Sequence, residues 1–163
     1  MGATGTDLAT GHNQATAQND PDSFKLTPSG DLMLSSGDDG QLIFVEQPGK
    51  TNQSVSFLDL LDPNTGLPFA TPAGLDDAVF ATSEKGSFYL ADTTNNRVLK
   101  IDAEDLPIGS LYASVGSLNE FVRVNTRTGR VKALVRNLKG PHGLEFLPQS
   151  NDDDDGVNDN TTQ

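Results

Sequence analysis

The stretch Tyr89-Leu-Ala-Asp-Thr-Thr-Asn-Asn-Arg-Val-Leu-Lys-Ile101 decides the fold class of this chain. It contains a short run suited to a strand, a polar turn, and a second run that ends on an aliphatic residue. Two more thirteen-residue stretches follow the same plan, at residues 33–45 and 112–124. Gly, Asp and Asn in their turns allow the backbone geometry that tight hairpins need. The three stretches therefore predict an all-β chain built from antiparallel hairpins.

A second repeat marks the strand that begins each structural unit. Pro21-Asp-Ser-Phe-Lys-Leu26, Leu75-Asp-Asp-Ala-Val-Phe80 and Pro141-His-Gly-Leu-Glu-Phe146 share a polar second residue and then alternate like half-buried strands. Strand-based repeats of about 40 to 50 residues are typical of β-propeller blades. We expect these stretches to be the innermost strands of antiparallel β-propeller blades, with almost no helix. Further strands are expected near residues 31–36, 41–46, 54–58, 87–92, 97–102, 110–115, 120–125 and 130–136.

The chain resembles a known group of propellers in these stretches. Residues 88–101 resemble the core of an NHL repeat, and residues 141–146 resemble the start of a blade in the same group, which includes the six-bladed gluconolactonase and senescence-marker family. The resemblance covers most of residues 21–148. It implies a partial propeller at 21–148, between a flexible polar segment at 1–20 and an acidic flexible tail at 149–163. For residues 1–20, the outer strand of a missing blade is the alternative to a loose tail.

The number of repeats is too small for a closed ring. The predicted innermost strands begin at residues 21, 75 and 141, which leaves room for about two blades and the first strand of a third. The hairpin expected at 110–125 and the strand at 130–136 exceed what one four-stranded blade needs. A closed propeller has about four to eight blades. We therefore expect either a piece of a longer propeller protein or self-association of several copies into a ring.

Composition and charge exclude some partners. The net charge of -12 argues against a nucleic acid or an anionic membrane surface, since both need basic groups. Basic residues concentrate between Arg123 and Lys139, and we interpret them as a solvated outer face. No apolar run is long enough to insert in a membrane, and no signal segment is seen. With no cysteine to indicate a redox compartment, localisation stays unassigned, and an extracytoplasmic location stays open for a piece of a longer protein.

The second residues of the predicted innermost strands form one candidate site: Asp22, Asp76 and His142. Such positions lie at the mouth of a propeller channel, where several blades bring side chains together. The resemblance to the gluconolactonase group implies a divalent metal that polarises a lactone carbonyl, although that group has Asn where this chain has His142. A histidine could ligate the metal or act as a general base. The alternative is that His142 caps backbone groups or lines a wet channel.

The acidic C-terminal stretch contains a second candidate site, for calcium. Asn151, Asp153 and Asp155 offer oxygens at alternate positions, followed by Gly156 and then Asp159, as in the first part of a calcium loop. The stretch resembles a thrombospondin type 3 or dockerin-like repeat. Thr162 stands where the closing bidentate Glu belongs, so weak binding is expected. The alternative is an acidic tail with no specific ligand.

Two functional classes follow from these observations. The first is a non-catalytic, NHL-like segment that binds a protein or small-molecule ligand which the sequence does not specify. The second is part of a gluconolactonase-like, metal-dependent hydrolase in which Asp22, Asp76 and His142 provide ligands or a base. No catalytic residue is assigned, and calcium or another divalent metal is the cofactor candidate. Asp92, Asn95, Asn96 and Arg97 are expected to tie their turn to the next blade by hydrogen bonds.

Overall fold

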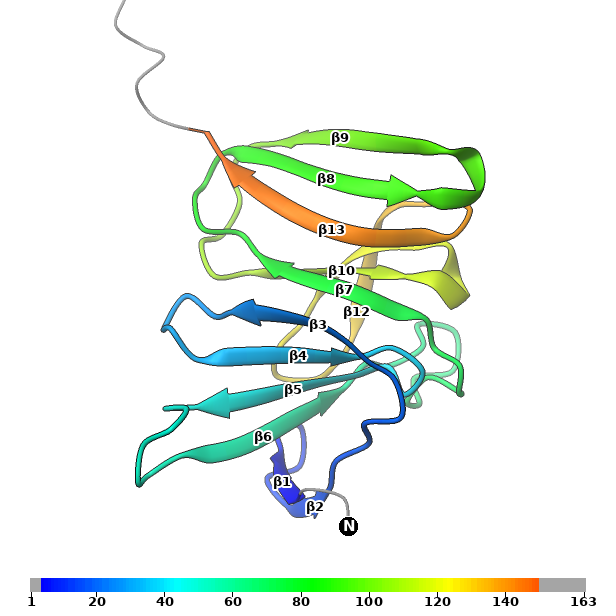
Figure 1. The fold of residues 1–163 in the computed structure, drawn as a ribbon. Helices are drawn as coiled ribbons and strands as arrows, with labels where there is room; N and C mark the ends of the chain where they lie inside the picture. The colour runs from blue at the N-terminus through cyan, green and yellow to red at the C-terminus, as the bar shows by residue number, and fades with distance from the viewer. Residues whose placement is uncertain (1–3, 150–163) are drawn as a thin grey trace, which may run out of the picture.

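The computed structural model describes residues 4–149, which form thirteen β-strands in three sheets (Figure 1). Within these residues there is no α-helix, and two short 3-10 turns, η1 (Thr93–Asn95) and η2 (Gly116–Leu118), join strands. The expected all-β class with antiparallel sheets is therefore confirmed. No sheet closes into a barrel.

The first sheet has six strands. In spatial order they are β2 (Asn13–Ala15), β1 (Thr4–Asp7), β6 (Ser54–Asp59), β5 (Gln41–Glu46), β4 (Leu32–Ser36) and β3 (Pro21–Leu26). Its neighbours pair antiparallel except β1 and β6, which are parallel. For residues 1–20, where a loose tail or the outer strand of a missing blade is expected, the structure has strands at residues 4–7 and 13–15, and the missing blade stays a prediction. The N-terminal strands extend this sheet beyond β6.

The second and third sheets take their strands alternately from the chain. The second sheet runs β12 (Val131–Val135), β11 (Glu120–Val124), β10 (Leu111–Val115) and β7 (Leu75–Phe80). The third runs β13 (Pro141–Pro148), β8 (Gly86–Asp92) and β9 (Arg97–Ala103). The expected strands exist, but their grouping into about two blades and a spare strand is corrected: β7 pairs with β10, and β13 pairs with β8. The hairpin at residues 110–125, which was more than one four-stranded blade needs, forms β10 and β11 of the second sheet.

The three repeated stretches form hairpins of identical register. In each hairpin the fourth residue pairs with the ninth, as Ser36 with Gln41, Asp92 with Arg97 and Val115 with Glu120. The eighth residue has a positive φ in all three: 62° at Gly40, 49° at Asn96 and 55° at Asn119. Gly and Asn adopt this left-handed conformation at the lowest cost. The repeat therefore encodes the hairpin register through one backbone position.

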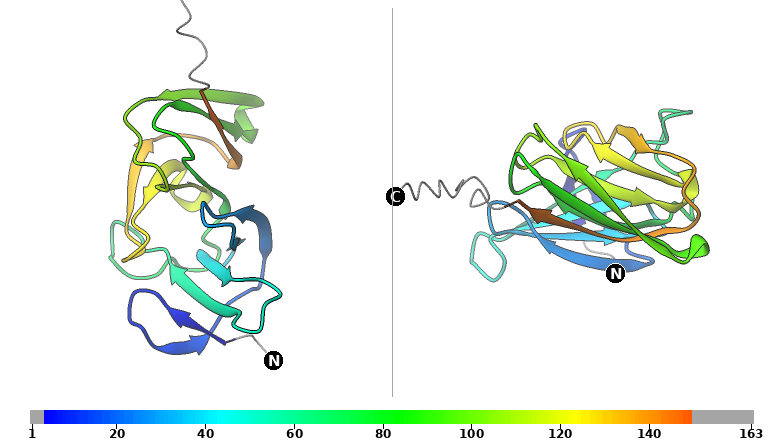
Figure 2. Two further views of the ribbon diagram at one scale, coloured as in Figure 1. Left: turned by 90° about the vertical axis from the view of Figure 1, so that its left-hand side faces the viewer. Right: turned by 90° about the horizontal axis from the view of Figure 1, so that it is seen from above.

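The three sheets are stacked as layers (Figure 2), and two apolar clusters hold them together. Alternation along the second sheet sends Ala113 and Val122 to the cluster shared with the first sheet, and Tyr112 and Phe121 to the cluster shared with the third. Phe88 packs in the latter cluster with ring centroids 4.6 to 5.1 Å from those of three other aromatic residues. The second sheet is therefore the middle layer.

Candidate functional site

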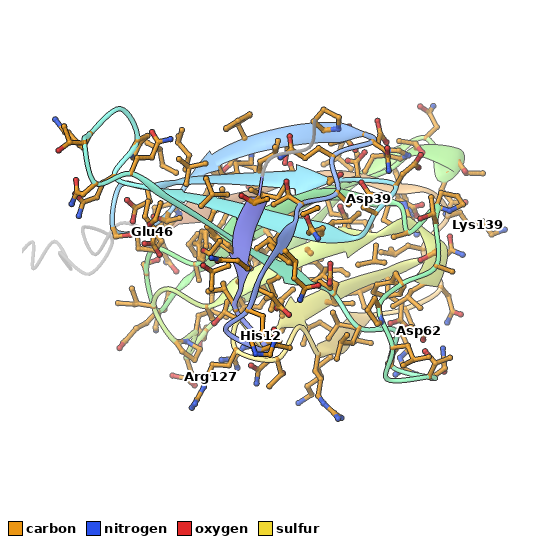
Figure 3. The ribbon with its side chains drawn as sticks, turned by 90° about the horizontal axis from the view of Figure 1, so that it is seen from below. His12, Asp39, Glu46, Asp62, Arg127 and Lys139 are labelled. Atoms are coloured by element: carbon orange, nitrogen blue, oxygen red, sulfur yellow. The ribbon has the colours of Figure 1, made fainter. Side chains whose placement is uncertain are left out.

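The strands β3, β7 and β13 lie side by side, and each is an edge strand of its own sheet (Figure 1). All three begin at the same end of the molecule. That end also carries Asp39, in the turn between β4 and β5, and Lys139, just before β13, whereas Glu46 lies at the opposite end (Figure 3). The second residues of the three strands are Asp22, Asp76 and His142, so the structure gathers the predicted site at one end of the sheets.

His142 and Asp76 are in direct contact. The His142 Nδ1 atom lies 2.5 Å from the Asp76 Oδ1 atom, and the Gly143 backbone nitrogen donates a hydrogen bond of 2.6 Å to Asp76 Oδ2. Both carboxylate oxygens of Asp76 therefore bond to residues at the start of β13. The His142 side chain remains 56% exposed. This pairing fixes one edge of the imidazole ring and leaves the rest of the ring accessible.

Asp22 lies near this pair without bonding to it. Partial burial raises the pKa of the Asp22 carboxyl above its usual value, and the negative charges of Asp76 and Asp20 raise it further, while His142 opposes them. Gly37 makes room for this crowding, because a Cβ atom there would lie 2.6 Å from Asp22 Oδ2 and 2.9 Å from Asp20 Oδ2. The folded state therefore disfavours the ionised form of the Asp22 carboxyl, which lies near His142.

A buried carboxylate, Asp77, joins the same three strands one residue further along. Its Oδ1 accepts a hydrogen bond of 2.7 Å from the Ser23 hydroxyl on β3, and its Oδ2 accepts one of 2.9 Å from the Leu144 nitrogen on β13. Lys25 then lies 3.6 Å from Asp77 and 2.9 Å from Glu145. Sequence analysis selected Asp76 and missed Asp77. The signal was the doubled Asp in β7, whose two side chains must point to opposite sides of the strand.

The described residues show no complete metal site. Among residues 4–149 no group of three or more His, Asp or Glu side chains is arranged to hold an ion. The His142 and Asp76 contact does have the form of an orienting pair, in which a carboxylate fixes one ring nitrogen and leaves the other for a ligand. The calcium-loop residues Asn151, Asp153, Asp155 and Asp159 lie outside the described residues. That candidate stays a prediction.

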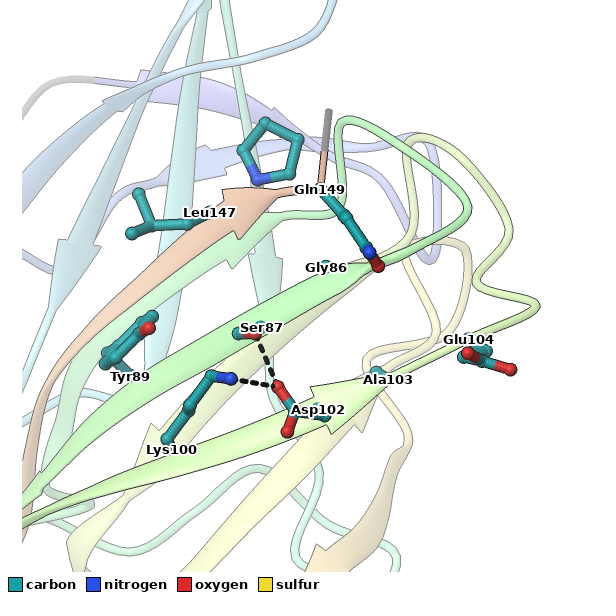
Figure 4. Close-up of a pocket in the computed structure, with 10 residues that line it drawn as sticks. Gly86, Ser87, Tyr89, Lys100, Asp102, Ala103, Glu104, Leu147 and Gln149 are labelled. Carbon is teal, nitrogen blue, oxygen red and sulfur yellow. Dashed lines mark hydrogen bonds and ion pairs between the residues drawn. The ribbon is translucent and has the colours of Figure 1, made fainter. Parts of the chain in front are cut away.

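A hollow of about 560 Å³ lies on the outer side of the third sheet (Figure 4). Asp102 accepts hydrogen bonds there from the Ser87 hydroxyl at 2.6 Å and from Lys100 Nζ at 2.8 Å. The bonds from Lys100 and Ser87 hold the pKa of the Asp102 carboxyl below its usual value. A carboxylate with a lowered pKa is a weaker base, and the Asp102 side chain is also exposed to solvent. The cluster is a surface polar network.

Asp92 organises the turn that resembles the NHL repeat. This buried residue accepts hydrogen bonds from Asn95 Nδ2 at 2.7 Å, Arg97 Nε at 2.9 Å and the Lys139 backbone nitrogen at 2.7 Å. Lys139 lies in the connection from β12 in the second sheet to β13 in the third. Of the four residues expected to tie this turn to its neighbour, Asp92 bonds outside the turn, to Lys139, whereas Asn95 and Arg97 bond to Asp92 within the turn. Asn96 contributes its left-handed conformation.

No family model, no curated protein and no solved structure matches this chain. No helix in the part of the chain that the structure describes is long and apolar enough to cross a membrane. Function must therefore be argued from the geometry described above.

Proposed function

We propose that this chain is a non-catalytic, propeller-type segment that acts as a binding or scaffold module, and that one face of its first sheet packs against a further blade. The observation that carries the proposal is a continuous apolar row across that face. Register places Phe24 beside Leu34, Leu34 beside Ile43, and Ile43 beside Phe57, from β3 across to β6. These side chains lie outside both apolar clusters that join the three sheets.

Exposure changes sharply along this row. Phe57 and Ile43 are each 2% exposed, on the side of the sheet where β1 and β2 lie, whereas Phe24 is 62% exposed. Leu26, next on the same face of β3, is 67% exposed. Large apolar side chains gathered on one face at an uncovered edge mark an interaction surface. Among residues 4–149, the part of this face near β6 is therefore buried and the part near β3 is uncovered.

The arrangement of β3, β7 and β13 supports a propeller-type partner. Asp77 bonds to both flanking strands, so the innermost strands of adjacent sheets are held together at one axis. Propeller blades are arranged in this way around a channel. A further blade, from a longer product or from a second copy, would extend the stack on the Phe24 face. The Asp22, Asp76 and His142 end would then border the channel mouth.

Association of the isolated chain tests this proposal. Sedimentation over a wide concentration range should show self-association, and the melting temperature should rise with concentration. Replacing Phe24 and Leu26 together by Ser should shift the chain towards monomer. The matched control is Val98→Ser, because Val98 is 68% exposed on β9 of the third sheet. A strict monomer with a concentration-independent melt, or equal dissociation by Val98→Ser, would overturn the proposal.

The His142 and Asp76 contact favours a second candidate, a metal-assisted hydrolase or lactonase similar to the gluconolactonase group. In a completed ring, His142 with Asp22 or Asp76 would hold a divalent ion that polarises a carbonyl. Calorimetric titration with zinc, manganese and calcium should then give saturable heat that His142→Ala removes and that a chain ending at Gln149 retains. Uptake that survives His142→Ala but disappears in the shortened chain would assign the ion to the acidic stretch and contradict this candidate.

A further inference from the structure

A mainly apolar cavity of about 300 Å³, open to solvent on one side, lies between the second and third sheets, away from the site described above. Its walls include Phe88 and Ile101 from the third sheet, Tyr112 and Phe121 from the second, and Leu106 from the connection between β9 and β10. The partly exposed Leu134 of β12 lies at its border. A volume of this size is at the lower end of small-molecule sites.

Two positive charges line the same cavity. Arg123 on β11 and Lys132 on β12 are direct cross-strand partners, and both side chains belong to its lining. On the other side of Arg123, its cross-strand partner on β10 is Tyr112. Like charges directly opposite each other in a sheet are destabilising. The register therefore holds an unfavourable pair of cations beside an aromatic cavity.

Neither cation of this pair has an acidic partner in the part of the chain that the structure describes. Within residues 4–149 neither Arg123 nor Lys132 forms an ion pair, although the chain carries an excess of acids. Asp105 also lines the cavity and forms no ion pair with either residue. Arg127 and Arg130 lie in an adjoining hollow of about 490 Å³, whose lining contains no acidic residue and shares Arg123 and Lys132 with the cavity. Among the described residues, basic side chains thus outnumber acidic ones around the cavity and the adjoining hollow.

We propose that the cavity binds a small organic anion with an apolar, aromatic body and a carboxylate or sulfonate head. The body would occupy the space beside Phe88, Tyr112 and Phe121, whose tilted rings offer edges and faces to another ring. The head would lie between Arg123 and Lys132 and convert their repulsion into two charge-assisted contacts. A neutral ligand of the same shape would lose those contacts, so the site discriminates by charge as well as shape.

The test uses 2-naphthoate as the probe and 2-naphthamide as its neutral counterpart, each titrated calorimetrically into the full chain. The double variant Arg123→Gln/Lys132→Gln should weaken naphthoate binding by at least about tenfold and leave its folding stability unchanged or higher. The matched control Arg127→Gln/Arg130→Gln removes the same charge from exposed residues that do not line the cavity, and should change binding by less than about threefold.

Several outcomes would overturn the proposal: no saturable naphthoate binding, equal affinity for naphthamide, or equal losses in the two double variants. A further check separates this site from the association surface. The Phe24→Ser/Leu26→Ser variant should keep full naphthoate affinity, because neither residue lines the cavity. Loss of binding in that variant would place the probe on the first sheet and contradict the assignment, whatever the outcome of the association experiments.

Discussion

The Asp92 carboxylate accepts a hydrogen bond of 2.7 Å from the backbone nitrogen of Lys139, forty-seven residues away along the chain. The bond connects the turn between β8 and β9 to the segment that enters β13. Thr93 and Thr94 add backbone hydrogen bonds of 3.0 Å from the same turn to Gly140 and Lys139. A buried acid thus fixes where the chain returns to the third sheet.

Asp92→Asn should destabilise the fold in a pH-dependent way. Hydrogen bonds from Asn95, Lys139 and Arg97 hold the pKa of Asp92 below its usual value. A depressed pKa contributes stability that is present above the unfolded value of about 3.9 and is lost as pH falls through the folded value. The difference from the parent in urea denaturation should be largest above about pH 5 and should shrink below about pH 3. Glu104→Gln, at an exposed ion pair with Lys85, should show little effect at either pH. A gap that widens in acid would contradict this account.

Phe88→Ala should cost about 3 to 5 kcal/mol of unfolding free energy. The ring is 1% exposed and contacts three aromatic neighbours between the second and third sheets, so truncation leaves a void where these layers meet. Chemical denaturation measures the loss. Val98→Ala on the exposed side of β9 should stay within about 0.5 kcal/mol. Similar costs for both variants would show that the two sheets are not packed as described.

Gly40→Ala should destabilise more than Gly30→Ala. Both glycines have positive φ angles, so alanine costs about 1 to 2 kcal/mol at either position. At Gly40 a Cβ atom would also lie 2.8 Å from the Ala73 Cβ, whereas nothing lies within 4 Å at Gly30. Overpacking should add about 1 kcal/mol or more. Thermal unfolding of the two variants gives the comparison, and equal losses would contradict the close approach at Gly40.

Asp22→Asn should stabilise the chain at neutral pH, and the gain should disappear in acid. Partial burial and the charges of Asp76 and Asp20 raise the pKa of Asp22, so the folded state disfavours its ionised form. Stability is then lost as pH rises from the unfolded value through the raised folded value. Melting temperatures at pH 7 and pH 3 measure the effect. A destabilised variant at pH 7 would indicate that Asp22 makes a favourable contact that outweighs this repulsion.

The local sequence pattern predicted where strands and turns lie, but it did not predict which strands pair across the sheets. Residues 33–45, 89–101 and 112–124 contain both halves of a hairpin, so their register is encoded within thirteen residues. The pairing of β7 with β10 is not encoded in this way, because alternation assigns the faces of a strand and leaves its neighbour open. Residues 1–20 look too polar to fold, yet within them β1 pairs with the edge of the sheet at β6 and β2 pairs with β1.

Asp22, Asp76 and His142 lie at one end of the sheets because they are the second residues of strands that begin at the same end, and their role as a binding site stays a prediction. The role of Asp77 depended on which face of β7 meets β3 and β13, which no single strand reveals. The cavity beside Arg123 and Lys132 was likewise hidden. Arg123 and Lys132 are exposed, in agreement with a solvated face, but the sequence pattern did not indicate the apolar cavity that they border.

The alternation of the chain between the second and third sheets makes the two inseparable. The chain forms β7 of the second sheet, then β8 and β9 of the third, then β10 to β12 of the second, and last β13 of the third. Neither sheet therefore corresponds to a continuous segment of the sequence. A cut anywhere between Glu104 and Val131 would separate β13 from the third sheet and at least one strand from the second sheet at the same time. Residues 75–148, which contain all the strands of both sheets, should therefore unfold as one cooperative unit.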